Sequence, residues 1–316
     1  MTKRLERGNP REVQKLSLKY KGISPKTRHR YESQIKIFFS YLTRNDIVLP
    51  SLYRQLDTVL SDYIDHMFME GEPIGYAGDL ISGISRFCPG ARLRIPTTRL
   101  WFRNWQREVV RVRALPIPAE VVKGLAGVAL AMERFDLAAL IPLGFLCMMR
   151  TGELLNLTKD DIIFSPYGSS AIITLRQTKT SGPNTEEGVL EDELVVRALR
   201  QVCDSLNDGE NIYSRPARCL GEDLRWLASL VGFEHKRFTP YSLRRGGATW
   251  HFHKFGSLNK TCLVGRWKHE RTAKIYIDGA AAEWTSWQFP LTGKSLMKRC
   301  RKAWKQKFSA ALSRQR

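Results

Sequence analysis

Two prolines about a third of the way along the chain divide it into regions with different hydrophobic patterns. Pro116 and Pro118 lie in the segment Ala114–Ala119, and paired prolines stiffen a chain and interrupt helices. Before this segment apolar residues recur at helical spacing, whereas after it helical patterns alternate with two short runs typical of strands. The 316 residues are enough for two domains of about 150 residues each. The sequence therefore predicts two domains joined at these prolines.

The region before the prolines is predicted to be a small all-helical domain, 23–113, preceded by a basic arm, 1–22. Ser24 and Pro25 form a helix start, with Ser24 as the N-cap and Pro25 in the first turn. We expect about four helices, one beginning there and the others over the apolar-periodic stretches Leu56 to Met69, Tyr76 to Phe87 and Leu100 to Val112.

The region after the prolines is predicted to be a mixed domain, 114–292, followed by a basic tail, 293–316. Leu137–Met149 is almost continuously apolar, so we expect a buried helix there. Two strands are expected, joined by a turn, and helices resume beyond them. The strands are Ser170–Leu175 and Gly188–Leu194, the turn is Thr178–Asn184, and the helices lie near Leu194, Leu220 and Leu243. The predicted fold class is thus mainly α with a small β-sheet.

Basic residues exceed acidic residues along the whole chain. There are 51 Lys and Arg against 31 Asp and Glu, which gives a net charge of +20 at pH 7. This excess favours a polyanionic partner, because each cation placed on a phosphate releases condensed counterions. An anionic membrane surface would attract the same charge. However, the sequence has no uncharged apolar window of about 18 residues, so we expect no membrane span.

The cysteines and the N-terminus indicate an intracellular protein. None of the six cysteines forms a C-x-x-C pair, and no histidine pair with zinc-ligand spacing lies beside them. The first residues are charged and lack the apolar core of a signal peptide. We therefore expect reduced thiols, no metal site and a location inside the cell. If the polyanionic partner is DNA, this location is the nucleus in a eukaryote or the nucleoid in a bacterium.

Four short segments carry the residues whose side chains could take part in catalysis, and the order of the segments is more informative than any one of them. They run from Met149 to Leu157, from Thr178 to Ser181, from Pro240 to Thr249 and from Gly265 to Tyr276. In this order they resemble the catalytic half of the tyrosine recombinases, the phage-integrase and Cre-like enzymes. The resemblance covers about residues 115–280, and the N-terminal helices resemble the core-binding domain of the family only loosely.

The family pattern is an arginine, a lysine on a β-hairpin, His-x-x-Arg, a histidine or tryptophan, and a tyrosine. Arg150 matches the first arginine and Lys179 the hairpin lysine. Arg244 matches the second arginine, and Trp267 falls nine residues before Tyr276, which is the spacing of the family. The resemblance implies a catalytic role for all five residues and an orienting role for a buried Glu153 beside Arg150.

These residue types suit the cleavage of a phosphodiester. Negative charge grows on the phosphate as a nucleophile adds, and Arg150 and Arg244 would stabilise it with planar, permanently charged forks. Lys179 would protonate the leaving oxygen as the general acid. Tyr276 would attack and form a covalent phosphotyrosine link, and Trp267 would position the site through its indole N–H and by packing.

Each of these residues also has a purely structural interpretation. Arg150 could cap an apolar helix, Lys179 could be a solvated hairpin lysine, and Tyr276 could be a half-buried core tyrosine. Their joint order and spacing favour the catalytic interpretation. A sixth candidate catalytic residue, Tyr241, departs from the family, because it stands where histidine is usual. Tyrosine has a pKa near 10, so it can donate a hydrogen bond but is a poor base at neutral pH. His269, two residues past Trp267, is a possible substitute.

The resemblance implies a C-shaped clamp around double-stranded DNA and a homo-tetramer on two DNA sites, without a metal or a small-molecule cofactor. The expected activity is cleavage and rejoining through a 3′-phosphotyrosine intermediate, as in the recombinase or integrase of a mobile element. A non-catalytic DNA-binding descendant and a topoisomerase-like relaxing enzyme are the alternatives. The candidate DNA contacts are Lys26, Arg28, Arg30, Lys36, Arg245 and Lys268.

Overall fold

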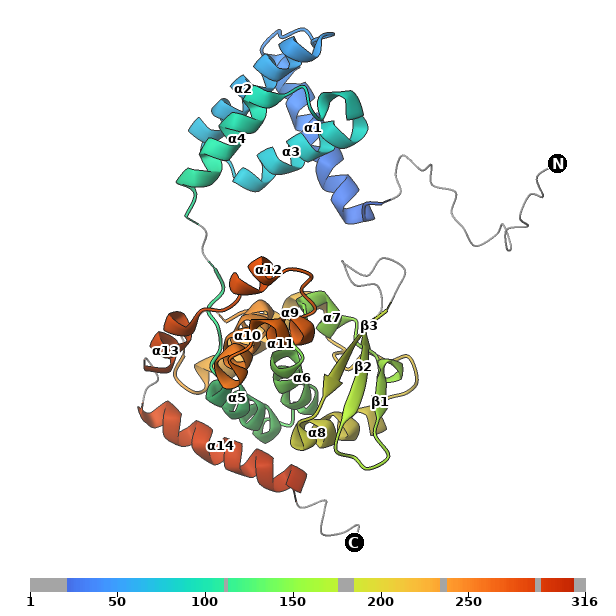
Figure 1. The fold of residues 1–316 in the computed structure, drawn as a ribbon, viewed down its shortest axis with the longest axis vertical. Coiled ribbons are helices and arrows are strands. Elements are labelled where there is room, and N and C mark those ends of the chain that lie inside the picture. Colours follow the sequence, from blue (N-terminus) through green and yellow to red (C-terminus); the bar gives the residue numbers. More distant parts are fainter. Residues whose placement is uncertain (1–21, 111–112, 176–184, 234–237, 288–290, 310–316) are drawn as a thin grey trace, which may run out of the picture. The chain divides into compact units, whose positions relative to one another are not determined.

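A computed structural model of the chain describes residues 22–110, 113–175, 185–233, 238–287 and 291–309. The chain divides into two compact units, which we call unit 1 (Met1–Val112) and unit 2 (Arg113–Arg316) (Figure 1). Helices make up most of both, and the sheet lies in unit 2. The predicted fold class, mainly α with a small β-sheet, is confirmed.

In the described part of unit 1 all regular secondary structure is helical, and turns connect the helices. Its elements are α1 (Pro25–Arg44), α2 (Tyr53–Met69), α3 (Ile74–Phe87), the short 3-10 helix η2 (Pro89–Ala91) and α4 (Pro96–Glu108). The four expected helices are therefore present. The first begins as predicted, because the Ser24 side chain accepts a hydrogen bond from the backbone N–H of Thr27 at 3.1 Å.

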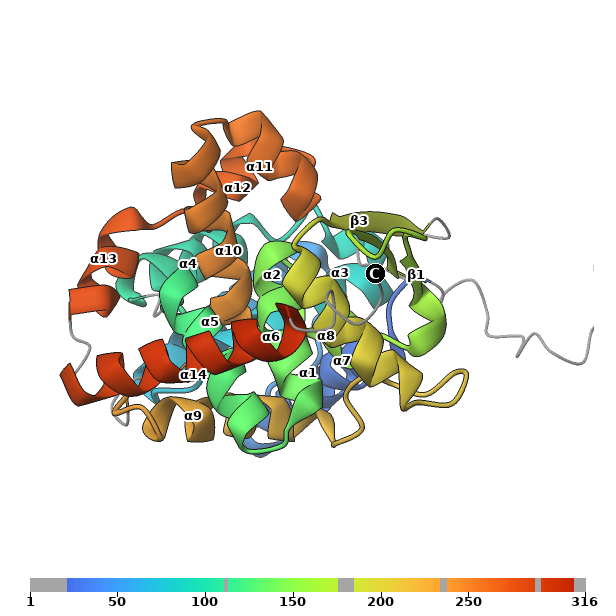
Figure 2. The same ribbon diagram turned by 90° about the horizontal axis from the view of Figure 1, so that it is seen from below.

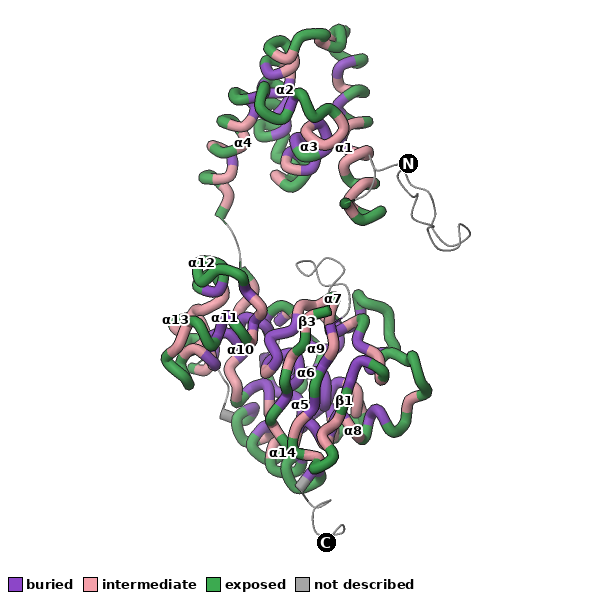
Figure 3. Tube along the Cα trace, turned by 45° about the vertical axis from the view of Figure 1, so that its right-hand side comes forward, coloured by how far each residue is buried: buried purple, intermediate pink, exposed green. Residues whose placement is uncertain are grey.

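Unit 1 has its own core, which lies between the four helices and appears as the buried stretches of the trace in Figure 3. Phe38, Leu60 and Leu80 are among its fully buried side chains. A buried carboxylate fixes the start of α4, since Asp57 accepts the backbone N–H groups of Thr97 at 3.0 Å and Thr98 at 2.8 Å. These bonds satisfy two donors that the first turn of a helix leaves open.

Helix α6 of unit 2 is buried along most of its length, and α5, α8 and α10 pack against it. The helical elements are α5 (Ala119–Ala131), α6 (Phe135–Leu146), α7 (Thr151–Leu155), the 3-10 helix η3 (Lys159–Asp161), α8 (Glu193–Asp204), α9 (Ala217–Ser229), α10 (Pro240–Phe255), α11 (Leu258–Gly265), α12 (Glu270–Lys274), α13 (Gly279–Trp287) and α14 (Leu291–Ser309). No helix in the described ranges is long and apolar enough to cross a membrane.

The sheet of unit 2 has three antiparallel strands in the order β1-β2-β3. They are β1 (Ile162–Phe164), β2 (Ala171–Leu175) and β3 (Glu186–Leu190). The two predicted strands correspond to β2 and β3, whereas β1 was not predicted. β3 begins before the predicted Gly188, and its expected end belongs to α8. The predicted turn over 178–184 lies outside the described residues.

The prediction of a separate basic tail at 293–316 is wrong for its described part. Helix α14 lies along α5 (Figure 2), and its side chains Met297, Trp304 and Phe308 are buried in the main core of unit 2. The two helices approach closely at Gly127, where a Cβ would collide with the backbone of Cys300. The basic residues of α14 occupy its outer face, and the apolar stripe belongs to the core.

A second close approach places the middle of α10 beside the end of α6. A Cβ at Gly247 would collide with the carbonyl oxygen of Phe145, so glycine is needed for this contact. The same approach brings Arg244, one turn earlier on α10, to the loop that follows α6. The carbonyl of Met148 in that loop accepts a hydrogen bond from the Arg244 guanidinium.

Candidate active site

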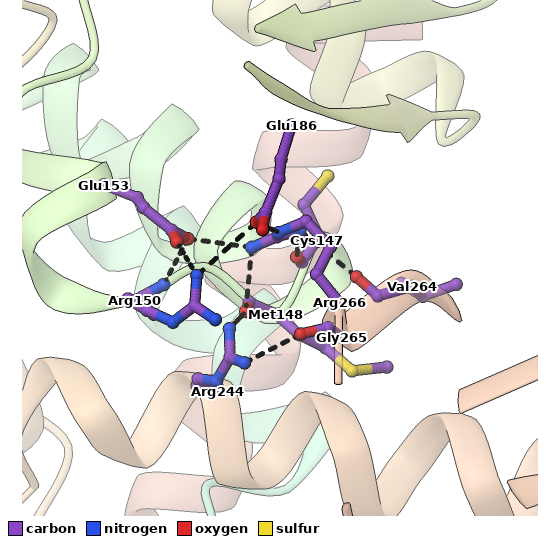
Figure 4. Close-up of polar contacts among 9 residues, drawn as sticks. All are labelled: Cys147, Met148, Arg150, Glu153, Glu186, Arg244, Val264, Gly265 and Arg266. Carbon is purple, nitrogen blue, oxygen red and sulfur yellow. Dashed lines mark hydrogen bonds and ion pairs between the residues drawn. The ribbon is translucent and has the colours of Figure 1, made fainter. Parts of the chain in front are cut away.

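The described chain brings three arginines together at the loop after α6 (Figure 4). Arg150 stands at the N-cap of α7, Arg244 on the first turns of α10, and Arg266 at the end of α11. The carboxylates of Glu153 and Glu186 point toward the guanidinium groups of Arg150 and Arg266. We call these five residues the arginine cluster.

Arg244 is completely buried, with 0% of its surface exposed. Its terminal nitrogens donate to the carbonyl oxygens of Met148 and, at 2.7 Å, Gly265. The guanidinium carbon lies 4.6 Å from the ring centroid of Trp267 and 5.3 Å from that of Tyr276, which are cation–π distances. Burial, reinforced by the charges of Arg150 and Arg266, lowers the pKa of Arg244 to about 10. The group therefore stays charged at neutral pH.

Arg150 and Glu153 hold one another in place. The Glu153 carboxylate accepts the backbone N–H of Arg150 at 2.7 Å and its side-chain Nη1 at 2.5 Å. The Glu153 side chain is only 7% exposed, while that of Arg150 is 25% exposed. The carboxylate thus fixes the arginine, whose guanidinium is still accessible, and this is the orienting arrangement that the resemblance implied.

Arg266 and Glu186 were missed by the sequence analysis. The Arg266 side chain is 7% exposed and lies 2.8 Å from Glu153 and 3.5 Å from Glu186. Glu186 also lies 3.6 Å from Arg150. Arg266 directly precedes Trp267 in a segment already singled out, but nothing in the local sequence distinguishes it from the solvated cations that follow. Only the tertiary arrangement shows its role.

The Tyr276 ring lies between two other aromatic side chains. Its centroid is 4.6 Å from that of Trp267 and 5.5 Å from that of Tyr241. Burial raises the pKa of Tyr276, but the hydrogen bond with Tyr241, the charge of Arg244 and the hydrogen bond with Trp267 outweigh burial and lower it overall. Burial and the bond to Tyr276 raise the pKa of Tyr241 to about 12. Tyr276 therefore ionises before Tyr241, and Tyr241 then donates to the ionised oxygen.

The chain around Tyr276 is tied to α10. Thr249 donates to the Tyr276 carbonyl at 3.3 Å and accepts the backbone N–H of Asp278 at 3.0 Å. The Asp278 carboxylate in turn accepts a hydrogen bond from Arg245 at 3.1 Å. These contacts fix the position of the tyrosine backbone relative to the helix that carries Arg244.

The prediction that Arg245 contacts DNA disagrees with its placement. Its side chain is 3% exposed and donates to Asp278 and to the Ala114 carbonyl. The local sequence shows two adjacent arginines, and helix geometry sends both of them into the protein in different directions.

The other predicted DNA contacts remain at the surface or near it. Lys26, Lys36 and Lys268 are exposed, and Arg28 is half-buried. Arg30 has a side chain that is 56% exposed, but its Nε donates to Asp79 at 2.8 Å. The four residues on α1 belong to unit 1 and Lys268 belongs to unit 2.

Two further candidates complete the comparison with the sequence. Lys179 lies outside the described residues. His269 is exposed at the N-cap of α12, and it makes no described contact with Tyr276. Within the described ranges, no group of three or more His, Cys, Asp or Glu side chains is placed to hold a metal ion.

Comparison with solved structures identifies the fold. The chain is similar to a lambda integrase dimer bound to a COC′ core site, with 20% identity, coverage of 84% of this chain and 93% of that chain, and a TM-score of 0.56. It is also similar to the Tn1549 transposon integrase in complex with circular intermediate DNA, with 16% identity, coverage of 84% and 95%, and a TM-score of 0.57. A third is the XerH site-specific recombinase bound to difH substrate, with 14% identity, coverage of 82% and 78%, and a TM-score of 0.52.

These similarities establish the class of fold, which is that of the tyrosine recombinase catalytic domains. No protein-family model matches the sequence, and no curated protein matches it.

Proposed function

We propose that this protein cleaves and rejoins DNA at specific sites through a 3′-phosphotyrosine intermediate formed by Tyr276, as a recombinase or integrase of a mobile element does. The observation that carries the proposal is the environment of the Tyr276 hydroxyl. A phenol with a lowered pKa lies against a buried, charged arginine within a cluster of guanidinium groups. A core tyrosine would need none of these features.

The geometry supports distinct roles for the arginines. Arg150 is accessible and held by Glu153, so it can bind the non-bridging phosphate oxygens directly. Arg244 lies behind the rings of Trp267 and Tyr276, and in this arrangement it stabilises the Tyr276 oxygen.

The remaining steps rest on the resemblance and on the fold. Lys179 is proposed as the general acid that protonates the leaving 5′ oxygen. The exposed cations Lys26, Lys36 and Lys268 are proposed to contact DNA phosphates. The DNA-bound state of the similar structures supports double-stranded DNA as the partner, and a homo-tetramer on two sites is the proposed assembly.

One observation favours a second candidate, a DNA-binding protein of the same fold that does not cleave. Arg244 has no exposed surface, and two of its nitrogens are already bound to backbone carbonyls. Cleavage decides between the candidates, because binding alone requires no covalent step at Tyr276.

The test uses duplexes that are first selected for binding from a random pool and then nicked, so that a cleaved strand fragment is lost and the adduct is trapped. We expect the wild-type protein to form an adduct that resists denaturation. The variant Tyr276→Phe should form none while binding the same DNA, because only the hydroxyl attacks. The matched control is Tyr167→Phe, since Tyr167 is 92% exposed in the turn after β1. An adduct of wild-type yield from Tyr276→Phe would refute the proposal.

A further inference from the structure

Arg266 has a backbone conformation that other residue types adopt more easily. It is the C-cap of α11 with φ 56° and ψ 44°, in the left-handed region. Glycine adopts this conformation without steric cost and is the usual residue at the end of a helix. An arginine that stays in such a position must be held there by its side chain, and backbone strain of this kind gathers at functional sites.

The side chain of Arg266 connects the end of α11 to three other segments of the arginine cluster. It donates to the carbonyl oxygens of Cys147 at 3.0 Å and Val264 at 3.1 Å, which fixes the loop after α6 to the end of α11. It also donates to Glu153 on α7 at 2.8 Å and lies 3.5 Å from Glu186 at the start of β3. With 7% of the side chain exposed, these contacts are shielded from water.

Each of the two carboxylates, Glu153 and Glu186, lies near two arginines, Arg150 and Arg266. Glu153 contacts Arg150 at 2.5 Å and Arg266 at 2.8 Å, and Glu186 lies 3.6 Å from Arg150 and 3.5 Å from Arg266. The described cluster thus contains three cations and two anions. Without Arg266, these two carboxylates would lose one of their arginine partners and act more strongly on Arg150.

We infer that Arg266 is a positioning residue for the proposed cleavage reaction: it binds Glu153 and Glu186 so that Arg150 keeps charge for the phosphate. The inference rests on the proposed function, and it assigns the role to a residue that does not itself touch the phosphate. It predicts that the loss of Arg266 is corrected by removing one negative charge, and that the correction appears in the cleavage rate and not only in the melting temperature.

The experiment compares Arg266→Gly, Glu186→Gln and the double variant. Arg266→Gly relieves the left-handed strain and removes the charge, and Glu186→Gln removes a carboxylate without changing its shape. Glu133→Gly is the matched control, because Glu133 has φ 57° but lies between α5 and α6, outside the cluster. Single-turnover adduct formation over a range of DNA concentrations gives the maximal cleavage rate and the half-saturating DNA concentration, and thermal melting reports folding.

We expect Arg266→Gly to lower the maximal cleavage rate by about tenfold with little change in the half-saturating DNA concentration. This tenfold loss is smaller than the ~100-fold loss expected when a group that contacts the phosphate directly is removed. The double variant should recover most of this loss, while the control Glu133→Gly, which lies outside the cluster, should cleave like the wild type. Wild-type cleavage by Arg266→Gly, or a folded double variant no faster than Arg266→Gly, would overturn the inference.

A second measurement separates this inference from the proposed function. Inorganic phosphate is titrated into each protein by calorimetry, without DNA and without cleavage. If the wild type forms no adduct, the proposed function fails. The positioning role then still stands if Arg266→Gly binds phosphate about tenfold more weakly than the wild type and the double variant does not. Equal phosphate binding by all variants, or no binding by the wild type, would refute the positioning role.

Discussion

Removing the hydroxyl of Tyr241 should move the pH dependence of cleavage to higher pH. Tyr241 donates a hydrogen bond to the Tyr276 oxygen, and this bond helps to lower the pKa of Tyr276 below that of an ordinary phenol. The variant Tyr241→Phe keeps the ring but loses the donor. The pKa of Tyr276 must then rise, so that at a fixed pH near neutrality a smaller fraction is ionised and ready to attack.

The size of the shift follows from the strength of one hydrogen bond to a charged oxygen. Such bonds contribute about 1.5–3 kcal/mol. Tyr241 is 40% exposed, so water can replace part of the lost bond and the lower end of the range applies. Since one pKa unit corresponds to about 1.4 kcal/mol, we expect the pKa of Tyr276 to rise by about one unit. The charge of Arg244 and the bond from Trp267 remain.

The assay is the rate of adduct formation from pre-bound DNA, measured over a range of pH. The rising limb of the profile should move up by about one pH unit, which makes Tyr241→Phe about tenfold slower on that limb and equal to the wild type on the plateau. Tyr167→Phe should leave the profile unchanged. An unchanged profile for Tyr241→Phe, or a rate lowered by the same factor at every pH, would show that Tyr241 does not act through the ionisation of Tyr276.

Three further outcomes are expected. Arg244→Lys should slow cleavage by ~100-fold or more and lower the melting temperature. The reason is that a lysine has one nitrogen, whereas Arg244 reaches the carbonyls of Met148 and Gly265 with two nitrogens of a planar fork. Equal cleavage by the Arg and Lys forms would contradict this prediction. Lys179→Ala should slow cleavage of ordinary DNA but much less that of DNA with a 5′-bridging sulfur, because a thiolate leaves without a proton, and equal defects would exclude Lys179 as the general acid. Lys26→Ala should weaken DNA binding regardless of sequence and reduce its salt dependence by about one ion, a change that an unchanged salt slope would disprove.

Local signals were sufficient for the helices of unit 1 because each signal acts within one or two turns. The N-cap at Ser24 and the proline after it define the start of α1 in the sequence and in the structure. The start of α4 was placed too late, at Leu100 instead of Pro96. Its first turn is held by Asp57, whose contribution comes from a distant helix and leaves no local pattern.

Elements that depend on tertiary contacts were harder to predict. Strand β1 has only three residues and pairs with β2, so its own pattern is too short for a period to be recognised. Helix α14 was predicted as a tail because its basic residues are numerous. Its apolar side chains at 297, 304 and 308 are separated by intervals of seven and four, which is a helical stripe that needs α5 as its partner.

The parts of the candidate site that lie within one short sequence segment were predictable. Arg150 and Glu153 are three residues apart on one turn, and the structure pairs them. Trp267 and Tyr276 are nine residues apart in the sequence, and the structure brings their rings together, tilted, with centroids 4.6 Å apart. What the sequence could not give is the direction of neighbouring side chains, as for Arg245, and the contacts of Arg266 with Glu186, which come from different segments.

The absence of histidine from both family positions has a consequence for the proton of Tyr276. Tyr241 and Trp267 each direct a donor at the Tyr276 oxygen, and neither donor titrates near neutral pH, since the pKa of Tyr241 is about 12 and an indole N–H does not ionise. Histidine, with a pKa near 6.5, would alternate between donor and base over the same range. The two donors therefore lower the pKa of Tyr276, but neither of them accepts its proton near neutral pH. We therefore expect a group other than these two side chains, such as water, to accept the proton, and the neighbouring Tyr241 is 40% exposed to solvent.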